Sequence, residues 1–586
     1  MGDRIMRARS TFRALLNFLL LTLSVALAGC GGGVNSPGAI SNGQPDPGIA
    51  LTQVRFKTPP LGWNSWNTFG CKDTEAIIKS VADAIASNGM AAAGYQYVTV
   101  DDCWVGGRNA TTGQLYSNAT TFPDGIAALA AYVHGKGLKF GLYTSGGTNT
   151  CAGLAHGTRP PSYPPGVGAG SLGHESVDAQ TFANWGVDYI KLDYCGGSLT
   201  AFPAMRAGIA ATGRTMFLSI NPYSANTTLP TNFASDGTLY VPAYADMSRI
   251  SQDISAKFTS VTSIIDTSAA DVAWAVPGYF NDMDMLEVGN GMTQDQDTAH
   301  FIMWSIMSSG LNAGNDVRSQ SAATQALLTN ANVIAVNQDA LALQAVLDTA
   351  DSAGSLQVWT KPLATTGTRA VAFLNRGATA APITVNFANL GLSGPVQATN
   401  VLTGASLGTV TQSLTQTVPA TGAVLVKLTG TDPVASNGPL ALQSWVWSAV
   451  QSGNVAVKVF PNGSPLPTGA TATGAVVVHG VSYIDGLTVN APAQLVYRLN
   501  GKCTTFQSDI GLDAAAQGGG TVDYQVWADN VELYDSGLVA NATPIKTVKV
   551  SVAGRNTLRL VITDGADGVT NDVADWANPS LACSSS

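Results

Sequence analysis

The sequence is poor in charge and in histidine. Charged residues make up only 11% of the 586 residues, whereas hydrophobic residues make up 45% and there are 63 glycines. This balance argues against a disordered or coiled-coil chain and is typical of a loop-rich globular protein of roughly two to four domains. The formal net charge of -9 argues against a nucleic-acid partner. The five histidines show neither metal-ligand nor triad spacing, and we expect no active-site metal and no cofactor.

Long apolar runs are also missing, except at the N-terminus. Four arginines precede an apolar run over residues 14–28, which is short for a membrane span. The run ends in Leu27-Ala28-Gly29-Cys30, which resembles a bacterial lipobox. We therefore predict a lipoprotein-type signal peptide over residues 1–29, cleavage before Cys30, and lipidation of its thiol. The alternative is an ordinary signal peptide that is cut near Ala28.

The residues after Cys30 suggest where the protein is found. Gly31 stands where an inner-membrane retention signal would have Asp, which favours an outer-membrane anchor. Residues 30–56 are rich in Gly, Pro, Asn and Ser and are interpreted as a linker. We expect an exported protein, either an outer-membrane lipoprotein or a periplasmic protein of a bacterium, with the membrane as a partner through its lipid.

Cysteines are few and odd in number. If Cys30 carries lipid, six of the seven remain, and an exported chain can oxidise them in pairs. Sequence alone does not fix their connectivity. Their distribution between the domains described next favours the pairs Cys71–Cys103, Cys151–Cys195 and Cys503–Cys583.

Three kinds of pattern follow one another along the chain. Over residues 57–345, short apolar runs alternate with amphipathic stretches, which predicts βα units and a parallel sheet. About eight strands in this length are typical of a (β/α)8 (TIM) barrel. Residues 346–430 alternate with period two and predict an antiparallel β-domain. A short linker leads to a third, also β-rich domain over residues 438–586.

One predicted barrel strand ends in an unusual charged pair. The apolar run Val187–Leu192 is followed by Asp193, and Lys191 points to the same face of the strand as Asp193. A charged pair at the end of a buried strand costs free energy unless it is paired or used. Catalytic groups of β/α barrels lie at these strand ends. Other predicted strands also end in polar groups, at Asn64–Trp66, Asp101-Asp102, Arg249 with Asp253, and Asn281–Asp284.

Carboxylates, cations and tryptophans at one end of a barrel suit the binding of a sugar. Carboxylates and amides bind hydroxyl groups, and apolar rings suit the C–H face of a pyranose. In a retaining glycosidase, one carboxylate attacks the anomeric carbon and a second, about 5–5.5 Å away, protonates the leaving oxygen. A neighbouring cation such as Lys191 would keep the nucleophile ionised.

Four ordered motifs resemble glycoside hydrolase family 27, the family of α-galactosidases and α-N-acetylgalactosaminidases. The resemblance covers about residues 57–430, the barrel and the antiparallel domain. The motifs are Leu61-Gly62-Trp63-Asn64-Ser65-Trp66-Asn67, Asp101-Asp102-Cys103-Trp104, Tyr189-Ile190-Lys191-Leu192-Asp193-Tyr194-Cys195 and Asn281-Asp282-Met283-Asp284-Met285-Leu286.

The resemblance implies roles for individual residues. Asp193 matches the nucleophile and Asp253 the acid/base, while Asp101 and Asp102 match carboxylates that bind the C4 and C6 hydroxyls of galactose. The first two cysteine pairs also look like bridges of the family. Together with the polar residues at the strand ends, the resemblance gives these predicted substrate-binding residues: Trp66, Asp101, Asp102, Tyr143, Lys191, Asn221, Arg249, Asp282 and Met285.

The chain departs from the family pattern after the fifth predicted strand. The family carries a Cys-Glu-Trp-Pro-like segment that reads the C2 substituent, whereas this chain has Ser219-Ile220-Asn221-Pro222-Tyr223. Asn221 can still reach a hydroxyl, and galactose remains the expected sugar. An N-acetylated galactose or β-L-arabinopyranose, which lacks C6, stays open.

The third domain resembles the NPCBM type, a jelly-roll-like β-sandwich related to carbohydrate-binding modules. The alternative is a purely structural sandwich. Relatives can hold a structural calcium, for which Asp564, Asp567 and Asp572 are candidates. The resemblance rests on Tyr497–Leu499, Phe506–Asp513, Tyr524–Asp529, Leu533–Gly537 and Ala574–Ala577.

We therefore predict an exported, membrane-anchored retaining α-galactosidase that acts on α-galactoside oligo- or polysaccharides. The alternatives are an α-N-acetylgalactosaminidase or β-L-arabinopyranosidase of the same family, or a non-catalytic carbohydrate-binding lipoprotein.

Overall fold

The structure is a computed structural model that describes residues 54–155, 169–223, 241–453, 455–459, 471–472, 475–514, 516, 519–565 and 568–584. Cys30, the predicted signal peptide and nearly all of the predicted N-terminal linker lie outside these residues. None of the helices in this part of the chain is long and apolar enough to cross a membrane.

The first domain is a parallel barrel. Eight strands pair in the order β10-β1-β2-β5-β6-β7-β8-β9, every pair parallel. A parallel bridge from Leu286 to Ala313 connects the segment after β9 to β10 and closes the ring. The predicted TIM barrel is thus confirmed. Its strands are β1 (Leu61–Asn64), β2 (Tyr97–Val100), β5 (Lys139–Ser145), β6 (Tyr189–Asp193), β7 (Phe217–Asn221), β8 (Met247–Arg249), β9 (Phe280–Asp282) and β10 (Leu311–Ala313).

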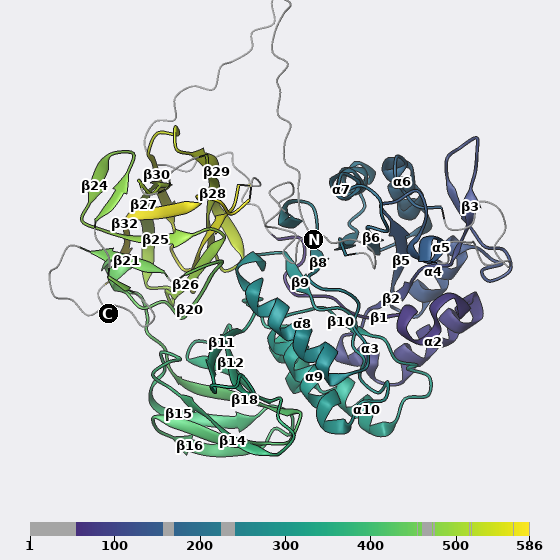
Figure 1. Ribbon diagram of the computed structural model, residues 1–586, viewed down its shortest axis with the longest axis horizontal. Coiled ribbons are helices and arrows are strands. Elements are labelled where there is room, and N and C mark those ends of the chain that lie inside the picture. Colours follow the sequence, from purple (N-terminus) through teal and green to yellow (C-terminus); the bar gives the residue numbers. More distant parts are fainter. Residues whose placement is uncertain are drawn as a thin grey trace, which may run out of the picture. The chain divides into compact units, whose positions relative to one another are not determined.

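Helices surround the strands on the outside of the barrel (Figure 1). Helix α2 begins where the side chain of Thr74 accepts the backbone N–H of Ile77, and it buries an apolar stripe that includes Ile78 and Ile85. The helices are α1 (Trp66–Phe69), η1 (Gly70–Lys72), α2 (Glu75–Ser87), α3 (Met90–Ala93), α4 (Ile126–Gly135), α5 (Cys151–Ala155), α6 (Glu175–Trp185), α7 (Ala201–Thr212), η3 (Val241–Ala243), α8 (Phe258–Ala270), η4 (Val272–Trp274), α9 (Gln294–Ile306), α10 (Ala322–Leu328) and α11 (Ala331–Asn337).

Two strands of the first domain stand apart from the barrel. β3 (Val105–Arg108) and β4 (Leu115–Ser117) form an antiparallel hairpin. Arg108 of this hairpin pairs with the buried Asp178 of α6 at 2.6 Å, which fixes the hairpin to the helix layer.

The second domain is antiparallel, as the period-two pattern predicts. A six-stranded sheet, β11-β12-β13-β18-β15-β16, packs with the pair β14-β17 around a core that includes Phe373 and Val426. Its strands are β11 (Val346–Ala350), β12 (Leu356–Pro362), β13 (Thr368–Asn375), β14 (Ala381–Asn386), β15 (Ser393–Asn400), β16 (Ser406–Val410), β17 (Ser413–Val418) and β18 (Gly422–Thr431).

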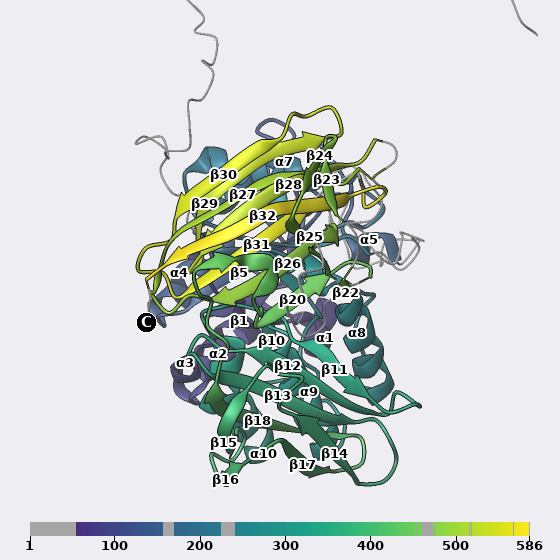
Figure 2. The ribbon, with the colours of Figure 1, turned by 90° about the vertical axis from the view of Figure 1, so that its left-hand side faces the viewer.

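The third domain is a β-sandwich whose strands are seen in Figure 2. One sheet runs β22-β21-β25-β32-β27-β30, with β19 beside β32, and the other β20-β26-β31-β28-β29. Its elements are β19 (Gly438–Pro439), η5 (Leu440–Leu442), β20 (Trp447–Val450), β21 (Ala456–Val459), β22 (Thr471–Ala472), β23 (Val476–Val478), β24 (Val481–Tyr483), β25 (Asp485–Asn490), β26 (Ala493–Arg498), β27 (Cys503–Leu512), β28 (Thr521–Ala528), β29 (Val531–Ala540), β30 (Lys546–Ser551), β31 (Thr557–Thr563) and β32 (Val573–Cys583).

Disulfides join the six described cysteines in the pairs that the sequence favours. Cys71 bonds Cys103, Cys151 bonds Cys195, and Cys503 bonds Cys583. The last pair connects β27 to the end of β32.

A buried charge cluster connects the second and third domains. Asp432, in the expected linker, pairs with Arg369 of β13 at 2.6 Å and with Arg498 of β26 at 3.1 Å. Arg498 also donates to the backbone carbonyls of Leu363 and Ala364. The side chains of the three charged residues are at most 1% exposed. We call Arg369, Asp432 and Arg498 the joint.

The third domain also contacts the barrel. Gln494 and Arg559 donate to the backbone carbonyls of Ala273 and Ala275 at 2.6 and 2.7 Å. The indole N–H of Trp447 donates to the carbonyl of Gln344 at 3.0 Å. The third domain therefore binds the segment that leads into β9.

Candidate active site

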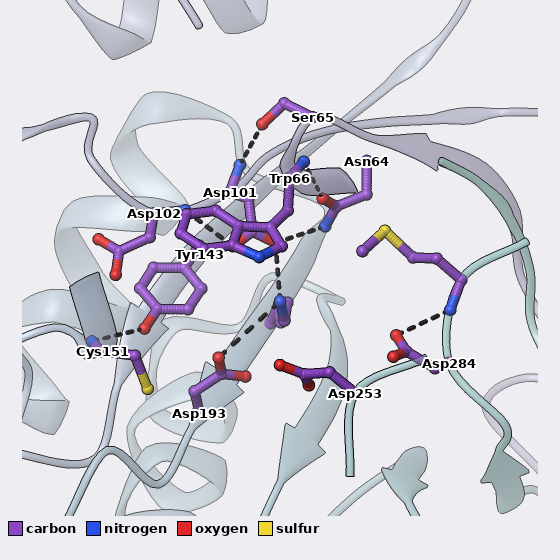
Figure 3. A network of polar contacts seen from close by, with 12 residues as sticks. Asn64, Ser65, Trp66, Asp101, Asp102, Tyr143, Cys151, Asp193, Asp253 and Asp284 are labelled. Atoms are coloured by element: carbon purple, nitrogen blue, oxygen red, sulfur yellow. Dashed lines mark hydrogen bonds and ion pairs between the residues drawn. The ribbon is translucent and has the colours of Figure 1, made fainter. Parts of the chain in front are cut away.

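Lys191 and Asp193 lie at the carboxyl end of β6, as the sequence predicts. Lys191 is the centre of a group of carboxylates: its Nζ is 2.8 Å from Oδ2 of Asp101 and 3.8 Å from Oδ2 of Asp193. Figure 3 shows Asp101 and Asp193 on different sides of the site. Barrel closure thus brings together residues that are 90 positions apart in the chain.

The two carboxylates after β2 are held in different ways. Asp101 Oδ2 accepts a hydrogen bond from Asn64 Nδ2 at 2.7 Å, in addition to the one from Lys191. Asp102 instead accepts the backbone N–H groups of Cys103 and Ala152 at 2.6 and 2.8 Å. Burial raises the pKa of Asp102 to about 6. Asp101 is therefore tied to Lys191, and Asp102 to the loop that contains Ala152.

Tyr143 of β5 and a disulfide form one side of the site. The Lys191 amine lies 5.4 Å from the centre of the Tyr143 ring. The Tyr143 hydroxyl accepts the backbone N–H of Cys151 at 3.1 Å and lies 3.2 Å from Sγ of Cys195. The bridge between these two cysteines therefore fixes the ring beside the carboxylate of Asp193.

Asp193 is buried but incompletely bonded. Its side chain is 9% exposed, and no described group hydrogen-bonds its Oδ1. Burial raises its pKa to about 7, although Lys191 opposes this. A buried carboxylate with an unused oxygen carries an unfavourable desolvation cost, which is typical of functional rather than structural groups.

Arg249, at the end of β8, holds two carboxylates. Its Nη2 lies 3.0 Å from Oδ2 of Asp284 and 3.2 Å from Oδ1 of Asp253. The pKa of Asp253 is lowered, because Arg249 and Lys191 outweigh the opposing effect of partial burial. The Asp253 side chain is 77% exposed, and Figure 3 shows its carboxylate pointing toward Asp193.

Asp284 belongs to the site although the predicted set contains only its neighbour Asp282. Its Oδ2 also accepts the backbone N–H of Ile254 at 2.8 Å, which ties the Asp253 loop to β9. Asp284 has a φ of 74°, so it lies in a turn rather than on the strand. Strand alternation therefore could not place it, but the second Asp of the Asn281–Asp284 motif was a usable signal.

A small polar cavity lies under the charged groups. It encloses about 20 Å³, room for about one water molecule. Burial raises the pKa of Asp282, one of its lining residues, to about 6. Asn221 also contributes, and its Oδ1 accepts the backbone N–H of Tyr223 at 3.0 Å. The predicted residues that line the cavity are Lys191, Asn221, Arg249, Asp282 and Met285.

Trp66 follows β1 above these groups. Its backbone N–H donates to Oδ1 of Asn64 at 2.8 Å, and Figure 3 shows its ring beside Asp101 and Tyr143. The half-buried indole can therefore cover one side of a bound molecule.

One cluster of side chains beside Asp193 has the spacing of metal ligands. Among the described residues, the one group close enough to share an ion is Cys151, Asp193 and Cys195. The two cysteines are joined in a disulfide, so they offer no thiolate. Of the calcium candidates in the third domain, Asp567 lies outside the described residues.

A parallel barrel with carboxylates, two cations and a tryptophan at the carboxyl ends of its strands defines a glycosidase. Its sequence places it within one family of that class. Residues 58–339 match the family described as "Alpha galactosidase A", and residues 353–428 match "Alpha galactosidase C-terminal beta sandwich domain". Residues 440–582 match "NPCBM/NEW2 domain". The chain belongs to the α-galactosidase family, glycoside hydrolase family 27.

The relatives that resemble this chain are α-galactosidases by name. The chain is 43% identical over 332 residues to α-galactosidase A of Cellvibrio japonicus, covering 55% of this chain and 76% of the relative. It is 39% identical to α-galactosidase 2 of Arabidopsis thaliana over 64% of this chain and 88% of the relative. The structure of α-galactosidase I from Mortierella vinacea is similar, with a TM-score of 0.57 and 33% identity over 64% of this chain and 98% of that one.

Proposed function

We propose that the protein hydrolyses terminal α-galactosides with retention of anomeric configuration, and that Asp193 is the nucleophile and Asp253 the acid/base. The observation that carries this proposal is the carboxylate of Asp193. It is buried beside Lys191, has an unused Oδ1, and faces Asp253 across the site.

The two steps follow from this arrangement. Asp193 attacks the anomeric carbon while Asp253 gives its proton to the glycosidic oxygen, and the bond between that carbon and oxygen breaks. The sugar is then an ester of Asp193. Asp253, now a carboxylate, takes a proton from water, whose oxygen attacks the anomeric carbon and releases Asp193.

The protonation states needed for this chemistry are set by substrate binding. Burial gives Asp193 a pKa of about 7, whereas Arg249 and Lys191 lower that of the exposed Asp253. A bound leaving group covers Asp253 and removes water from it, which raises its pKa. The single proton of the pair then moves to the residue that must donate it.

Galactose is the sugar that we propose. Asp101, with Lys191 and Asn64, offers a charged acceptor for ring hydroxyls, and Asn221 lines the cavity where the family reads C2. The two relatives cited above are α-galactosidases by name, which favours galactose over N-acetylgalactosamine and β-L-arabinopyranose.

A substrate panel tests the proposal. We expect hydrolysis of p-nitrophenyl α-D-galactoside to exceed that of the α-N-acetylgalactosaminide and the β-L-arabinopyranoside. Asp193→Ala should be inactive, and azide should rescue it with formation of the inverted glycosyl azide. Substantial turnover by purified Asp193→Ala without azide would overturn the mechanism, and a wild-type enzyme inactive on all three sugars would favour a non-catalytic sugar-binding protein.

We also propose that the protein is exported and anchored through lipidated Cys30, which the lipobox supports. Metabolic labelling with a fatty acid in a bacterial host should mark the wild type but not Cys30→Ser. Equal labelling of both proteins, or of neither, would contradict the anchor.

A further inference from the structure

The loop between α8 and β9, residues 271–279, is held from outside by the third domain. We call it the η4 loop. Gln494 of β26 donates to the backbone carbonyl of Ala273 at 2.6 Å, and Arg559 of β31 donates to that of Ala275 at 2.7 Å. Nε of Arg559 also donates to Oε1 of Gln494 at 2.7 Å, so the two side chains are fixed relative to each other.

Trp274 of the η4 loop connects this contact with the surroundings of the catalytic residues. Its indole N–H donates to Oε1 of Gln451, which follows β20 of the third domain, at 2.9 Å. Trp274 is 3% exposed and lines a small cavity of about 20 Å³ that Arg249 also lines. One side chain therefore contacts the third domain and the space beside Arg249.

Asn281 of β9 gives a second connection, directly before Asp282. Its Nδ2 donates to the backbone carbonyl of Asp271 at 2.7 Å and to Oε1 of Gln344 at 3.0 Å. Asp271 is the first residue of the η4 loop, and the backbone carbonyl of Gln344 accepts the indole N–H of Trp447. Both partners of Asn281 therefore belong to segments that the third domain binds.

This side of the barrel has few hydrogen bonds of its own. β8 and β9 have three residues each, and β7 and β8 are paired over two positions, whereas β5 and β6 are paired over five. Nε of Arg249, at the end of β8, is buried and has no partner among the described residues. Since neither the strand ladder nor its own hydrogen bonds fully fix Arg249, its position depends on what packs around it.

The position of Asp253 depends in turn on Arg249. The Asp253 side chain is 77% exposed, and Nη2 of Arg249, at 3.2 Å, is the hydrogen-bond donor that the described residues offer to its carboxylate. A misplacement of about 1 Å in a reacting group can cost about a hundredfold in rate. A small movement of the η4 loop would therefore reach the group that must protonate the leaving oxygen.

We propose that the third domain is a working part of the active site: through the η4 loop it holds Arg249, and with it Asp253, in place for proton transfer. Gln451 and Gln494 are then positioning residues, although they lie in a domain of the sugar-binding type. The inference rests on the proposed function, from which it takes the role of Asp253.

The test compares two substrates that differ in how much their leaving group needs a proton. Phenol is a weaker acid than p-nitrophenol, so cleavage of phenyl α-D-galactoside depends more on Asp253 than cleavage of the p-nitrophenyl compound. Gln451→Leu removes the acceptor of Trp274 and keeps a side chain of similar size. The matched control is Gln443→Leu, at another half-buried glutamine, whose side chain bonds the backbone of residues 436–439.

We expect Gln451→Leu to lower the ratio of kcat/KM for the phenyl galactoside to kcat/KM for the p-nitrophenyl galactoside roughly tenfold. Gln443→Leu should keep the wild-type ratio even if it lowers the stability. A merely structural role of Gln451 would lower both rates by the same factor. Gln451→Ala provides the same comparison if the leucine variant does not fold.

An unchanged or higher ratio in the Gln451 variant overturns the inference, and so does an equal fall in the control. Failure of the proposed function is distinct, since the wild-type enzyme would then hydrolyse neither aryl galactoside.

Discussion

The joint and the barrel mouth, by which we mean Asp101, Lys191, Asp193, Arg249 and Asp253, are both built from carboxylates that face buried cations. The cations lie closer to the carboxylate of Asp432 in the joint than Lys191 lies to Asp193 in the mouth. In the joint, each oxygen of Asp432 lies within 3.1 Å of an arginine, and water is excluded. At the mouth, Asp193 keeps an unused oxygen and sits 3.8 Å from Lys191, while Asp253 is largely exposed.

This difference separates a structural from a functional use of charge. A buried ion pair is stable only when its charges approach closely, and in the joint both oxygens of Asp432 lie close to an arginine. At the mouth, Asp193 keeps an acceptor that no described residue satisfies, and burial raises its pKa. The same substitution at the two places should therefore have opposite effects.

Asp193→Asn should give the largest change. We expect kcat to fall at least roughly 10³-fold, because an amide cannot attack the anomeric carbon. The free energy of unfolding should stay within about 1 kcal/mol of the wild type or rise, because a buried carboxylate with an unused oxygen is removed. Steady-state kinetics and denaturant unfolding measure both. A strongly destabilised variant would show that Asp193 is a structural residue.

Asp432→Asn should lower the stability and leave the activity nearly unchanged, the reverse of Asp193→Asn. It leaves Arg369 and Arg498 without their counter-charge, and we expect a loss of about 3–5 kcal/mol in the free energy of unfolding. kcat on the aryl galactoside should remain within about twofold. Asp266→Asn, at the exposed partner of Arg376, is the control and should cost less than about 1 kcal/mol. Equal losses in the two variants would remove the distinction between buried and exposed pairs.

The pH dependence of kcat/KM tests the protonation of Asp193 and Asp253. The pair Asp193 and Asp253 works only with one proton, and the higher of its pKa values is about 7 in the free enzyme. kcat/KM should therefore fall as the pH rises above about 7, because the pair then has no proton to donate, and should stay high well below that pH. With Asp253→Ala and an activated aryl leaving group, this alkaline fall should disappear. Its persistence at the same pH would assign it to another group.

Of the effects predicted here, that of Lys191→Met on the pH dependence of kcat/KM should be the smallest. The amine opposes the effect of burial on Asp193, so its loss raises the pKa of that carboxyl. The alkaline fall in kcat/KM should move up by roughly one pH unit, together with a lower rate. Lys139→Met, at an exposed lysine at the opposite end of β5, is the control and should leave the profile unchanged. A shift of the alkaline fall to lower pH would contradict the effect of Lys191 on the pKa of Asp193.

The barrel could be predicted from sequence because each of its strands is a short apolar run that ends in a polar residue. About eight strands were expected, and the barrel has eight. The third domain was expected to be rich in β-strands, but not every strand in it could be placed. β27 illustrates the reason: two register shifts interrupt its pairing with β32, so the period-two signal is broken.

The candidate site was predictable where a residue follows directly from a strand, as Lys191 and Asp193 do. It was not predictable where a turn redirects the chain. Asp284 was named only as part of the Asn281–Asp284 motif, because its position depends on a turn. The different partners of Asp101 and Asp102 depend on a distant loop. The catalytic roles of Asp193 and Asp253 stay predictions until the variants are measured.

The joint has a consequence for how such enzymes diversify. A domain attached by a flexible tether can be lost, gained or exchanged between genes with little effect on its neighbour. Here Asp432, in the segment between two domains, shares its charge with an arginine from each of them. A recombination breakpoint on either side of it would strand at least one buried arginine. The joint therefore couples the second and third domains of this chain, and removing the third domain would take from Asp432 one of its two arginines.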